Sequence, residues 1–295
     1  MKETFPKTSE RFPSYEEQLN VPHLIPIDGE IVEIIDVCPE NVKDPVPVMM
    51  VLGWSESPRS QEKNIRANFD NGRRVISPNT PHGIEPGELV EGVSGHPAVE
   101  LRKMAGLIKS LEALGIEKVD IVAHSEGAIY AILTAYLFPE KVRNVVLVNP
   151  AGMIGKDSLP RLMVGFSADL TKQVIKDLMN GGPTFLLNGL KVLSKNPLQA
   201  IKSVLAIANS DIRDMLRDVR EQGTKITVIA TTDDIAFPMK KMQEALGGGD
   251  LDGLYSLPGS HNEYLTNPEP YAKITEHALS NMAANKKGES EEINP

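Results

Sequence analysis

The stretch KVDIVAHSEGAIYAILTAYLFPE, residues 118–140, runs from an apolar segment through the short sequence AHSEG into an alanine-rich segment. The residues VDIVAH at 119–124 predict a buried strand, and GAIYAILTAYLF at 127–138 predicts a helix that ends before Pro139. Ser125 therefore lies at a strand-to-helix junction, which exposes a side chain above the edge of a sheet. It is either a nucleophile or the N-cap of the helix, a position that serine favours.

Segments of the same two kinds flank this unit. Residues 97–115 place apolar side chains at helical spacing and end at a glycine, and residues 268–285 predict a final helix. Strands that alternate with helices indicate the α/β class, with a mostly parallel central sheet flanked by helices. Apolar or alternating runs predict the other strands at 29–37, 46–54, 73–79, 142–150, 225–234 and 253–259.

The alternation breaks between about 152 and 222, where several amphipathic helical patterns occur and no convincing strand. We expect an inserted, all-helical cap in this region. The predicted division is an N-terminal arm at 1–27, a core at 28–151 and 223–285, the cap at 152–222, and a polar, disordered tail at 286–295.

Composition narrows the class of protein. The net charge of −9 over 295 residues argues against nucleic-acid binding, which needs clustered Lys and Arg. Cys38 is the only cysteine, so no intramolecular disulfide can form, and its apolar surroundings predict a buried structural thiol. The six histidines show no metal-ligand spacing, and we expect neither a metal nor a cofactor.

The sequence also bears on location. The N-terminus lacks the apolar segment of a secretory signal, and the longest apolar run, 128–138, is shorter than the about 20 residues that span a bilayer. We therefore expect a soluble, cytoplasmic protein without a membrane span.

Six blocks, in order along 46–151 and 225–284, resemble the α/β-hydrolase superfamily. They are VLGWSES, RRVISPNTPHG, LEALGIEKVDIVAHSEGA, PEKVRNVVLVNPAG, TTDDIAFP and GSHNEYLTNPEPY. The resemblance implies the α/β-hydrolase fold, with a nucleophile elbow, an acid and a histidine in that chain order and an oxyanion hole near the first block.

By this resemblance Ser125 is the nucleophile and His261, in the loop after the last strand, is its base. A serine hydroxyl needs a neighbouring imidazole, which in turn needs an acid to orient it. Either Asp233 or Asp234 could be that acid; in the family it commonly precedes a proline by four residues, which selects Asp234. Ala123 replaces the first glycine of the common G-x-S-x-G motif, and its single extra methyl group is small enough for the tight turn.

The oxyanion hole falls, by alignment, on the backbone N–H groups of Trp54 and Glu126. Leu52 stands where the family commonly carries a histidine, but the donors are backbone groups, so the chemistry is unaffected. The Glu126 side chain has three open interpretations: it favours the helix dipole, it repels anionic substrates, or it forms a salt bridge with an arginine. His124 precedes the serine and points to the opposite side of the strand, so we interpret it as structural.

The expected activity is hydrolysis of carboxylic esters, lactones or thioesters through an acyl-enzyme, with a small hydrophobic molecule as substrate. Two alternatives remain: hydrolysis of carbon–carbon bonds, whose enzymes usually carry a glycine-rich run after the first block that GWSESPRS lacks, and a ligand receptor on a hydrolase scaffold. The cap supplies apolar side chains for a pocket, namely Met153, Leu159, Leu162, Met163, Phe166, Phe185, Leu186 and Leu187.

Overall fold

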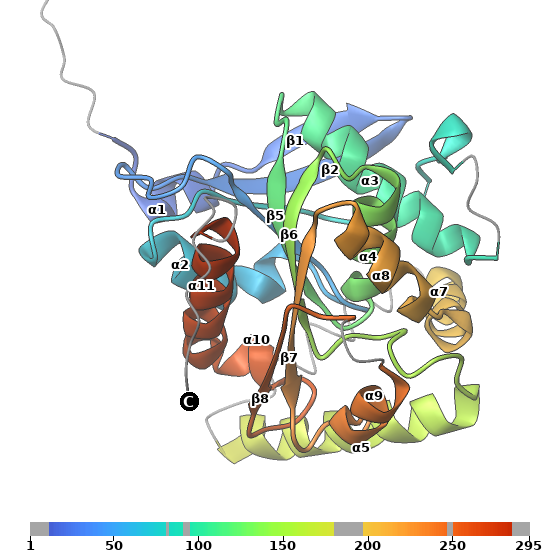
Figure 1. Cartoon of the computed structure of the whole chain (residues 1–295). Coiled ribbons are helices and arrows are strands. Elements are labelled where there is room, and N and C mark those ends of the chain that lie inside the picture. The colour runs from blue at the N-terminus through green and yellow to red at the C-terminus, as the bar shows by residue number, and fades with distance from the viewer. Residues whose placement is uncertain (1–11, 81–82, 91–94, 180–196, 247–249, 285–295) are drawn as a thin grey trace, which may run out of the picture.

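The computed structural model describes residues 12–80, 83–90, 95–179, 197–246 and 250–284 (Figure 1). Its centre is an eight-stranded sheet in the order β1-β2-β4-β3-β5-β6-β7-β8. The strands are β1 His23–Ile27, β2 Glu30–Val37, β3 Val48–Val51, β4 Val75–Pro78, β5 Val119–His124, β6 Val142–Val148, β7 Lys225–Thr231 and β8 Gly253–Leu257.

The sheet is mostly parallel, as the sequence predicted. Strand β2 pairs antiparallel with both β1 and β4, and every other neighbouring pair is parallel. The carboxyl ends of β3, β5, β6, β7 and β8 therefore meet along one edge of the sheet, which is where open α/β sheets place their ligands.

Helices cover both faces of the sheet. Figure 1 shows α3, α4 and α8 on one face and α2 and α11 on the other. The α-helices are α1 Tyr15–Leu19, α2 Glu62–Asp70, α3 Ala98–Ala113, α4 Gly127–Leu137, α5 Leu159–Met179, α7 Pro197–Asn209, α8 Arg213–Glu221, α9 Met239–Ala245, α10 Glu263–Thr266 and α11 Pro268–Ala284, with short 3-10 helices η1 Pro58–Gln61 and η2 Gly87–Val90.

Alternate side chains of each central strand enter two different apolar clusters. Along β5, Ile121 and Ala123 belong to the cluster under α3 and α4, whereas Val122 belongs to the cluster under α2 and α11. All six residues of β5 are buried. Burial on both faces explains why the central strands appear in the sequence as nearly continuous apolar runs.

Each predicted strand contains an observed one, but the sequence missed β1. This strand lies in the predicted N-terminal arm and pairs with β2 in the register His23↔Ile34. Its five residues include Pro26 and two exposed positions before it, which is typical of an edge strand and gives no clear alternation.

The described part of the region predicted as a cap contains the helices α5, α7 and α8 and no strand. Leu216 and Val219 of α8 are buried in the same cluster as α4, so the last part of the region packs directly on the core. The predicted boundaries at 152 and 222 stay a prediction, and the predicted tail at 286–295 lies outside the described residues.

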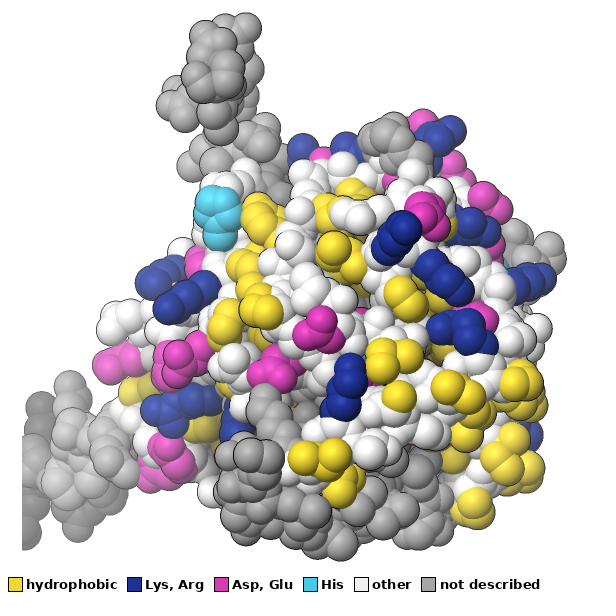
Figure 2. All heavy atoms as spheres, turned by 90° about the horizontal axis from the view of Figure 1, so that it is seen from below, with side chains coloured by type: hydrophobic (Ala, Val, Ile, Leu, Met, Phe, Trp, Pro, Cys, Tyr) yellow, Lys and Arg dark blue, Asp and Glu magenta, His cyan; other side chains and the backbone are white. Residues whose placement is uncertain are grey.

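The outer surface of α5 and α7 is rich in exposed apolar side chains. Val164 of α5 is 67% exposed and Leu198 of α7 is 62% exposed. Figure 2, a view from the side of α5 and α9, shows apolar side chains interspersed with charged ones. Over the described residues, no helix has the length and apolar character that crossing a bilayer requires.

Candidate functional site

Ser125 lies on a tight turn between β5 and α4. Its φ of +53° is in the left-handed region, and its N–H donates to the Val148 carbonyl over 3.0 Å. A Cβ atom on Gly127 would lie 2.7 Å from the Val51 carbonyl oxygen, so the start of α4 passes too close to β3 for any side chain there. The N-cap position of α4 belongs to Glu126, with no side-chain capping bond, so Ser125 is not the N-cap.

The three predicted residues Ser125, His261 and Asp234 are brought together. His261 Nε2 lies 2.9 Å from Ser125 Oγ, and His261 Nδ1 lies 2.8 Å from Asp234 Oδ2. Asp234 Oδ1 accepts the N–H of Phe237 over 2.8 Å, which fixes the carboxylate. Asp233 is exposed and its N–H donates to the Gly259 carbonyl, so the geometry favours Asp234 over its neighbour.

This arrangement can move a proton from a serine hydroxyl to an imidazole and stabilise the resulting charge. Burial alone would lower the pKa of His261, but the Asp234 carboxylate beside it outweighs burial and raises that pKa above its ordinary value. All three side chains are buried, with exposures of 3% for Ser125, 4% for Asp234 and 3% for His261. Their electrostatic interactions are therefore screened little by water.

The backbone N–H groups of Trp54 and Glu126 follow β3 and Ser125 in the chain, and β3 and β5 are paired through Val51 and Ala123. In the part of the chain that the structure describes, neither N–H group is paired with a backbone or side-chain acceptor. An oxyanion hole requires two such free donors, and its assignment to Trp54 and Glu126 stays a prediction.

The Glu126 side chain points into the core. It is 2% exposed, and its Oε1 lies 2.5 Å from Nζ of Lys103 on α3. The salt-bridge interpretation therefore describes it best, with a lysine in place of the arginine considered from the sequence. Glu100 lies in the same cluster, where burial, and then the charge of Glu126, raises its pKa well above the ordinary value.

Two aromatic rings, from α5 and from the loop after β7, lie near the His261 ring. The ring centroid of Phe237 lies 5.3 Å from that of His261, and Phe166 of α5 lies 6.1 Å from it. Phe166 also packs against Trp54 at 5.7 Å. Of the other cap residues considered, Met153 and Leu162 are buried in the core cluster, Leu159 and Met163 are exposed, and 185–187 lie outside the described residues.

Helix α5 is docked on the loop that follows Asp234. Arg161 Nη2 donates to the Ala236 carbonyl over 2.7 Å, and Asp169 Oδ2 accepts the N–H groups of Ile235 and Ala236, each over 3.3 Å. Between them along the helix, a Cβ atom on Gly165 would lie 2.9 Å from the Ala236 Cα. The spacing of four residues places the three positions on one face of α5.

Three polar residues at the site were not identified from the sequence. Asn149, at the carboxyl end of β6, has a φ of +45° and donates from Nδ2 to the His261 carbonyl over 2.8 Å. Its place at a strand end is the sequence signal that indicates such a residue. Glu56 and Asp169 are also buried, close to the triad formed by Ser125, His261 and Asp234. No spacing pattern in the sequence identifies either residue as part of the site.

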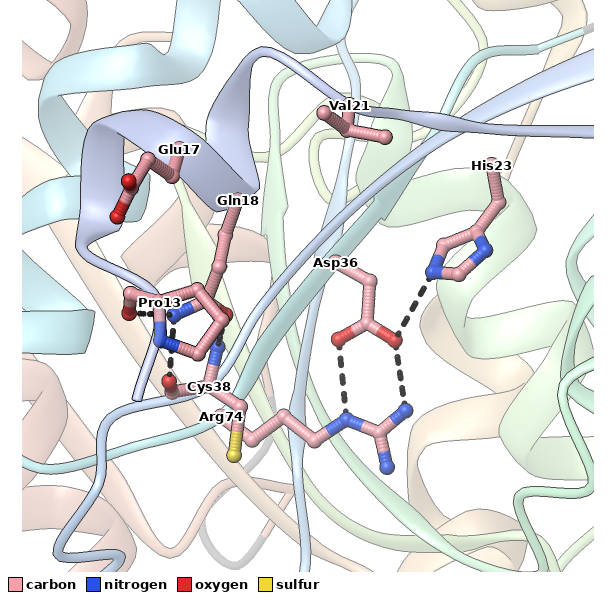
Figure 3. A pocket seen from close by; sticks show the side chains of 8 residues that line it. All are labelled: Pro13, Glu17, Gln18, Val21, His23, Asp36, Cys38 and Arg74. Atoms are coloured by element: carbon pink, nitrogen blue, oxygen red, sulfur yellow. Dashed lines mark hydrogen bonds and ion pairs between the residues drawn. The ribbon is translucent and has the colours of Figure 1, made fainter. Parts of the chain in front are cut away.

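A cavity of about 670 Å³ lies elsewhere, between α1 and the end of β2 (Figure 3). Three of its polar side chains pair with each other: Arg74 donates to Asp36 over 3.0 and 2.7 Å, and His23 Nε2 lies 3.7 Å from Asp36. Cys38 lines it half-buried, not buried as expected, and burial raises the pKa of its thiol. Because β2 runs opposite to β4, this cavity is at the sheet edge away from Ser125.

Comparison with known proteins gives the same fold. A family model described as alpha/beta hydrolase fold matches residues 46–198. Carboxylesterase structures from Nitrososphaera gargenis include one with a TM-score of 0.64 at 17% identity, covering 90% of this chain and 100% of that one. The bromoperoxidase of Bacillus anthracis has a TM-score of 0.64 at 17% identity, covering 88% and 100%.

One curated relative is closer in sequence over a shorter stretch. The 2-hydroxy-6-oxo-6-phenylhexa-2,4-dienoate hydrolase of Comamonas testosteroni is 32% identical over 113 residues. These residues are 38% of this chain and 37% of that protein. Similar chains thus include proteins named for ester hydrolysis, halide oxidation and dienoate hydrolysis.

Proposed function

The chain belongs to the α/β-hydrolase family, and from this we propose that it is a serine hydrolase that cleaves carboxylic esters, lactones or thioesters of small to medium hydrophobic molecules. The hydrogen-bonded relay from Ser125 through His261 to Asp234 carries the proposal. We propose the predicted arm, core and helical cap as its domain organisation, and the cytoplasm as its location.

In the first half of the reaction Ser125 Oγ attacks the substrate carbonyl carbon while His261 Nε2 takes the hydroxyl proton. The negative charge that develops on the carbonyl oxygen is held by the N–H groups of Trp54 and Glu126. The tetrahedral intermediate then breaks its bond to the leaving oxygen or sulfur. His261 returns the proton to that atom, and an acyl-enzyme remains on Ser125.

In the second half a water molecule gives its proton to His261 and attacks the acyl carbon. The intermediate collapses with cleavage of the bond to Ser125 Oγ, which takes the proton back from the imidazole. The products are a carboxylic acid and the free enzyme. Asp234 stays ionised throughout and stabilises the imidazolium that forms in each half.

The side chains beside the triad support a hydrophobic substrate. Phe237 and the cap residue Phe166 lie against His261, and Trp54 extends the same aromatic surface. Aromatic rings remove apolar substrate surface from water but supply no counter-charge for an anionic group.

A second candidate is carbon–carbon bond hydrolysis, favoured by the similarity to the dienoate hydrolase of Comamonas testosteroni. The same relay can serve both reactions. A dienoate carries a carboxylate, which an aromatic surface suits less well than it suits a neutral ester, and we therefore favour ester hydrolysis.

The direct test is labelling with a fluorophosphonate probe, which reacts with an activated serine. We expect rapid, stoichiometric labelling of the wild-type protein and none of Ser125→Ala. Labelling of both at the same rate would overturn the proposal. Asp234→Asn and Asp233→Asn distinguish the acid: only the first should lose activity, because only Asp234 contacts His261.

Rates of substrate turnover distinguish ester hydrolysis, carbon–carbon bond hydrolysis and a ligand receptor. A chain-length series of nitrophenyl esters, with a small lactone panel, should be hydrolysed with many turnovers, whereas the 2-hydroxy-6-oxo-dienoate should be hydrolysed slowly. Faster turnover of the dienoate would support the second candidate. Labelling of Ser125 followed by a single turnover would support the receptor on a hydrolase scaffold.

A further inference from the structure

A second histidine–carboxylate pair lies directly behind the triad. Nδ1 of His124, the residue before Ser125, lies 2.5 Å from Glu56 Oε1. The two side chains are 1% and 6% exposed. The His124 ring packs between two others, with centroid distances of 5.1 Å to His261 and 5.0 Å to Tyr264.

Both ring nitrogens of His124 face hydrogen-bond acceptors. Burial would raise the pKa of Glu56, but His124 and the hydrogen bonds from Gly53 and Gln61 outweigh it and hold that pKa below its ordinary value, so Glu56 is a carboxylate. The other ring nitrogen of His124, Nε2, lies 3.2 Å from the His261 carbonyl oxygen. Carboxylate and carbonyl oxygens only accept, so each ring nitrogen of His124 faces an acceptor to which it can donate a proton.

We propose that His124, as an imidazolium paired with Glu56, is a positioning residue that fixes His261 and the oxyanion loop relative to Ser125. This inference rests on the proposed hydrolysis. Neither side chain touches the reacting atoms, and each acts through groups that do.

On one side, the pair holds the main chain of His261. His124 Nε2–H donates to the His261 carbonyl, which also accepts Nδ2 of Asn149 over 2.8 Å. Two donors from the ends of β5 and β6 thus fix one carbonyl group. Rotation of the loop that carries the imidazole would break both bonds.

On the other side, the pair holds the loop that contains Trp54. Glu56 Oε2 accepts the Gly53 N–H over 2.9 Å and Nε2 of Gln61 over 2.6 Å, and the Glu56 N–H donates to the Gly53 carbonyl over 3.2 Å. A Cβ atom on Gly53 would lie 2.6 Å from Glu56 Oε1, so the carboxylate fills the space beside the glycine. Hydrogen bonds between Gly53 and Glu56 therefore close the turn that contains Trp54.

The other ionisable groups near His124 have their own partners or stay neutral. Asp234 engages His261 from the far side of the imidazole, and Asp169 of the cap engages the loop after Asp234. Tyr264, from α10, has a pKa raised well above the ordinary value by burial, so it stays neutral. Glu56 is therefore the carboxylate that balances the charge of His124.

Two measurements test the inference. In wild-type protein labelled with heavy nitrogen at histidine, NMR spectra recorded under the conditions of the kinetic assay should show a proton on both ring nitrogens of His124. Glu56→Gln should lower kcat by roughly 10- to 100-fold, because the base and the oxyanion loop are misplaced. KM should change by less than about threefold, because substrate contacts are retained.

The matched control is Glu62→Gln, an exposed glutamate at the start of α2, which should behave as wild type. His124→Gln keeps a donor toward His261 but not toward Glu56, and should lose less activity than His124→Phe, which keeps neither. The inference is overturned if wild-type His124 carries a single ring proton, or if Glu56→Gln matches Glu62→Gln in kcat. If Glu56→Gln does not fold, the wild-type spectrum decides.

Failure of this inference is distinguishable from failure of the proposed function. If wild-type protein is labelled by the fluorophosphonate and Glu56→Gln is labelled equally fast, the hydrolase stands and the positioning role is wrong. If the wild-type protein itself is not labelled at Ser125, the proposed function fails, whatever the protonation of His124.

Discussion

Gly127 is the position in the elbow where an added methyl group meets backbone from two residues. Its Cβ atom would lie 2.7 Å from the Val51 carbonyl oxygen and 2.9 Å from that of Leu52. We expect Gly127→Ala to lower kcat roughly 10- to 100-fold and to destabilise the fold by about 1–3 kcal/mol through overpacking. Ester turnover and thermal unfolding measure the two effects.

Ala123→Gly is the matched comparison for Gly127→Ala. Glycine is the common residue at this position of the motif, so activity should stay within about twofold of wild type. The fold should lose about 1–2 kcal/mol, because glycine is more flexible when unfolded and a buried methyl group is removed. If Ala123→Gly lost more activity than Gly127→Ala, our explanation of the elbow would be wrong.

The pKa of His261 determines how activity depends on pH. Only the neutral imidazole can accept the Ser125 proton, and Asp234 raises the pKa of His261 despite burial. As pH falls through this raised pKa, kcat/KM should decline, with a midpoint above the ordinary value of about 6.5. Asp234→Asn should move the midpoint of fluorophosphonate labelling to lower pH. A wild-type midpoint below the ordinary value would contradict this.

Helix α5 and the loop after Asp234 form one docked unit through Arg161, Gly165 and Asp169. Gly165→Ala should push this loop away from the helix, because its Cβ atom would lie 2.9 Å from the Ala236 Cα. We expect kcat to fall about tenfold as Asp234 and His261 lose alignment. Val164→Ala, at a neighbouring and 67% exposed position of α5, is the control and should leave kcat unchanged. Equal effects of the two substitutions would rule out docking as the cause.

The sequence predicted some parts of the structure better than others. The central strands and α4 were predicted because burial on both faces of a sheet leaves long apolar runs. Ser125, Asp234 and His261 follow strand ends, where the family motif assigns them roles and the structure brings them together. Glu56 and His124 could not be paired in this way, since their contact joins residues 68 positions apart, and neither position carries a periodic signal.

Two buried charge clusters lie at opposite ends of the sheet. At the amino ends of the strands, Arg73 is 2% exposed and lies 2.7 Å from Asp44 and 2.9 Å from Glu276 of α11. At the carboxyl ends, Lys103 contacts Glu126 and donates to Ser203 of α7 over 3.2 Å. The first cluster joins distant parts of the core, whereas the second joins the core, the elbow and the cap.

We expect Lys103→Met to destabilise the protein by about 3–5 kcal/mol, because it leaves the buried Glu126 carboxylate without a cation. Arg73→Met should destabilise it less, because Asp44 keeps its ion pair with Arg143. Their activities should differ. Arg73 is separated from Ser125 by the length of the strands, so kcat should be retained wherever the variant is folded. Lys103→Met releases the residue that follows Ser125 and should lower kcat as well. Denaturant unfolding and ester turnover, measured on the same samples, test the contrast; equal kcat losses would contradict it.

Trp54 is the only tryptophan in the chain, and it contacts the helices α5 and α7. Its indole Nε1 donates to the Ala200 carbonyl of α7 over 3.2 Å, and its ring packs against Phe166 of α5. The intrinsic tryptophan fluorescence of the protein therefore arises from one place, beside Ser125. Withdrawal of α5 and α7 would expose the indole to water and shift its emission to longer wavelength, so the fluorescence of an unmodified sample would report movement of these helices in real time.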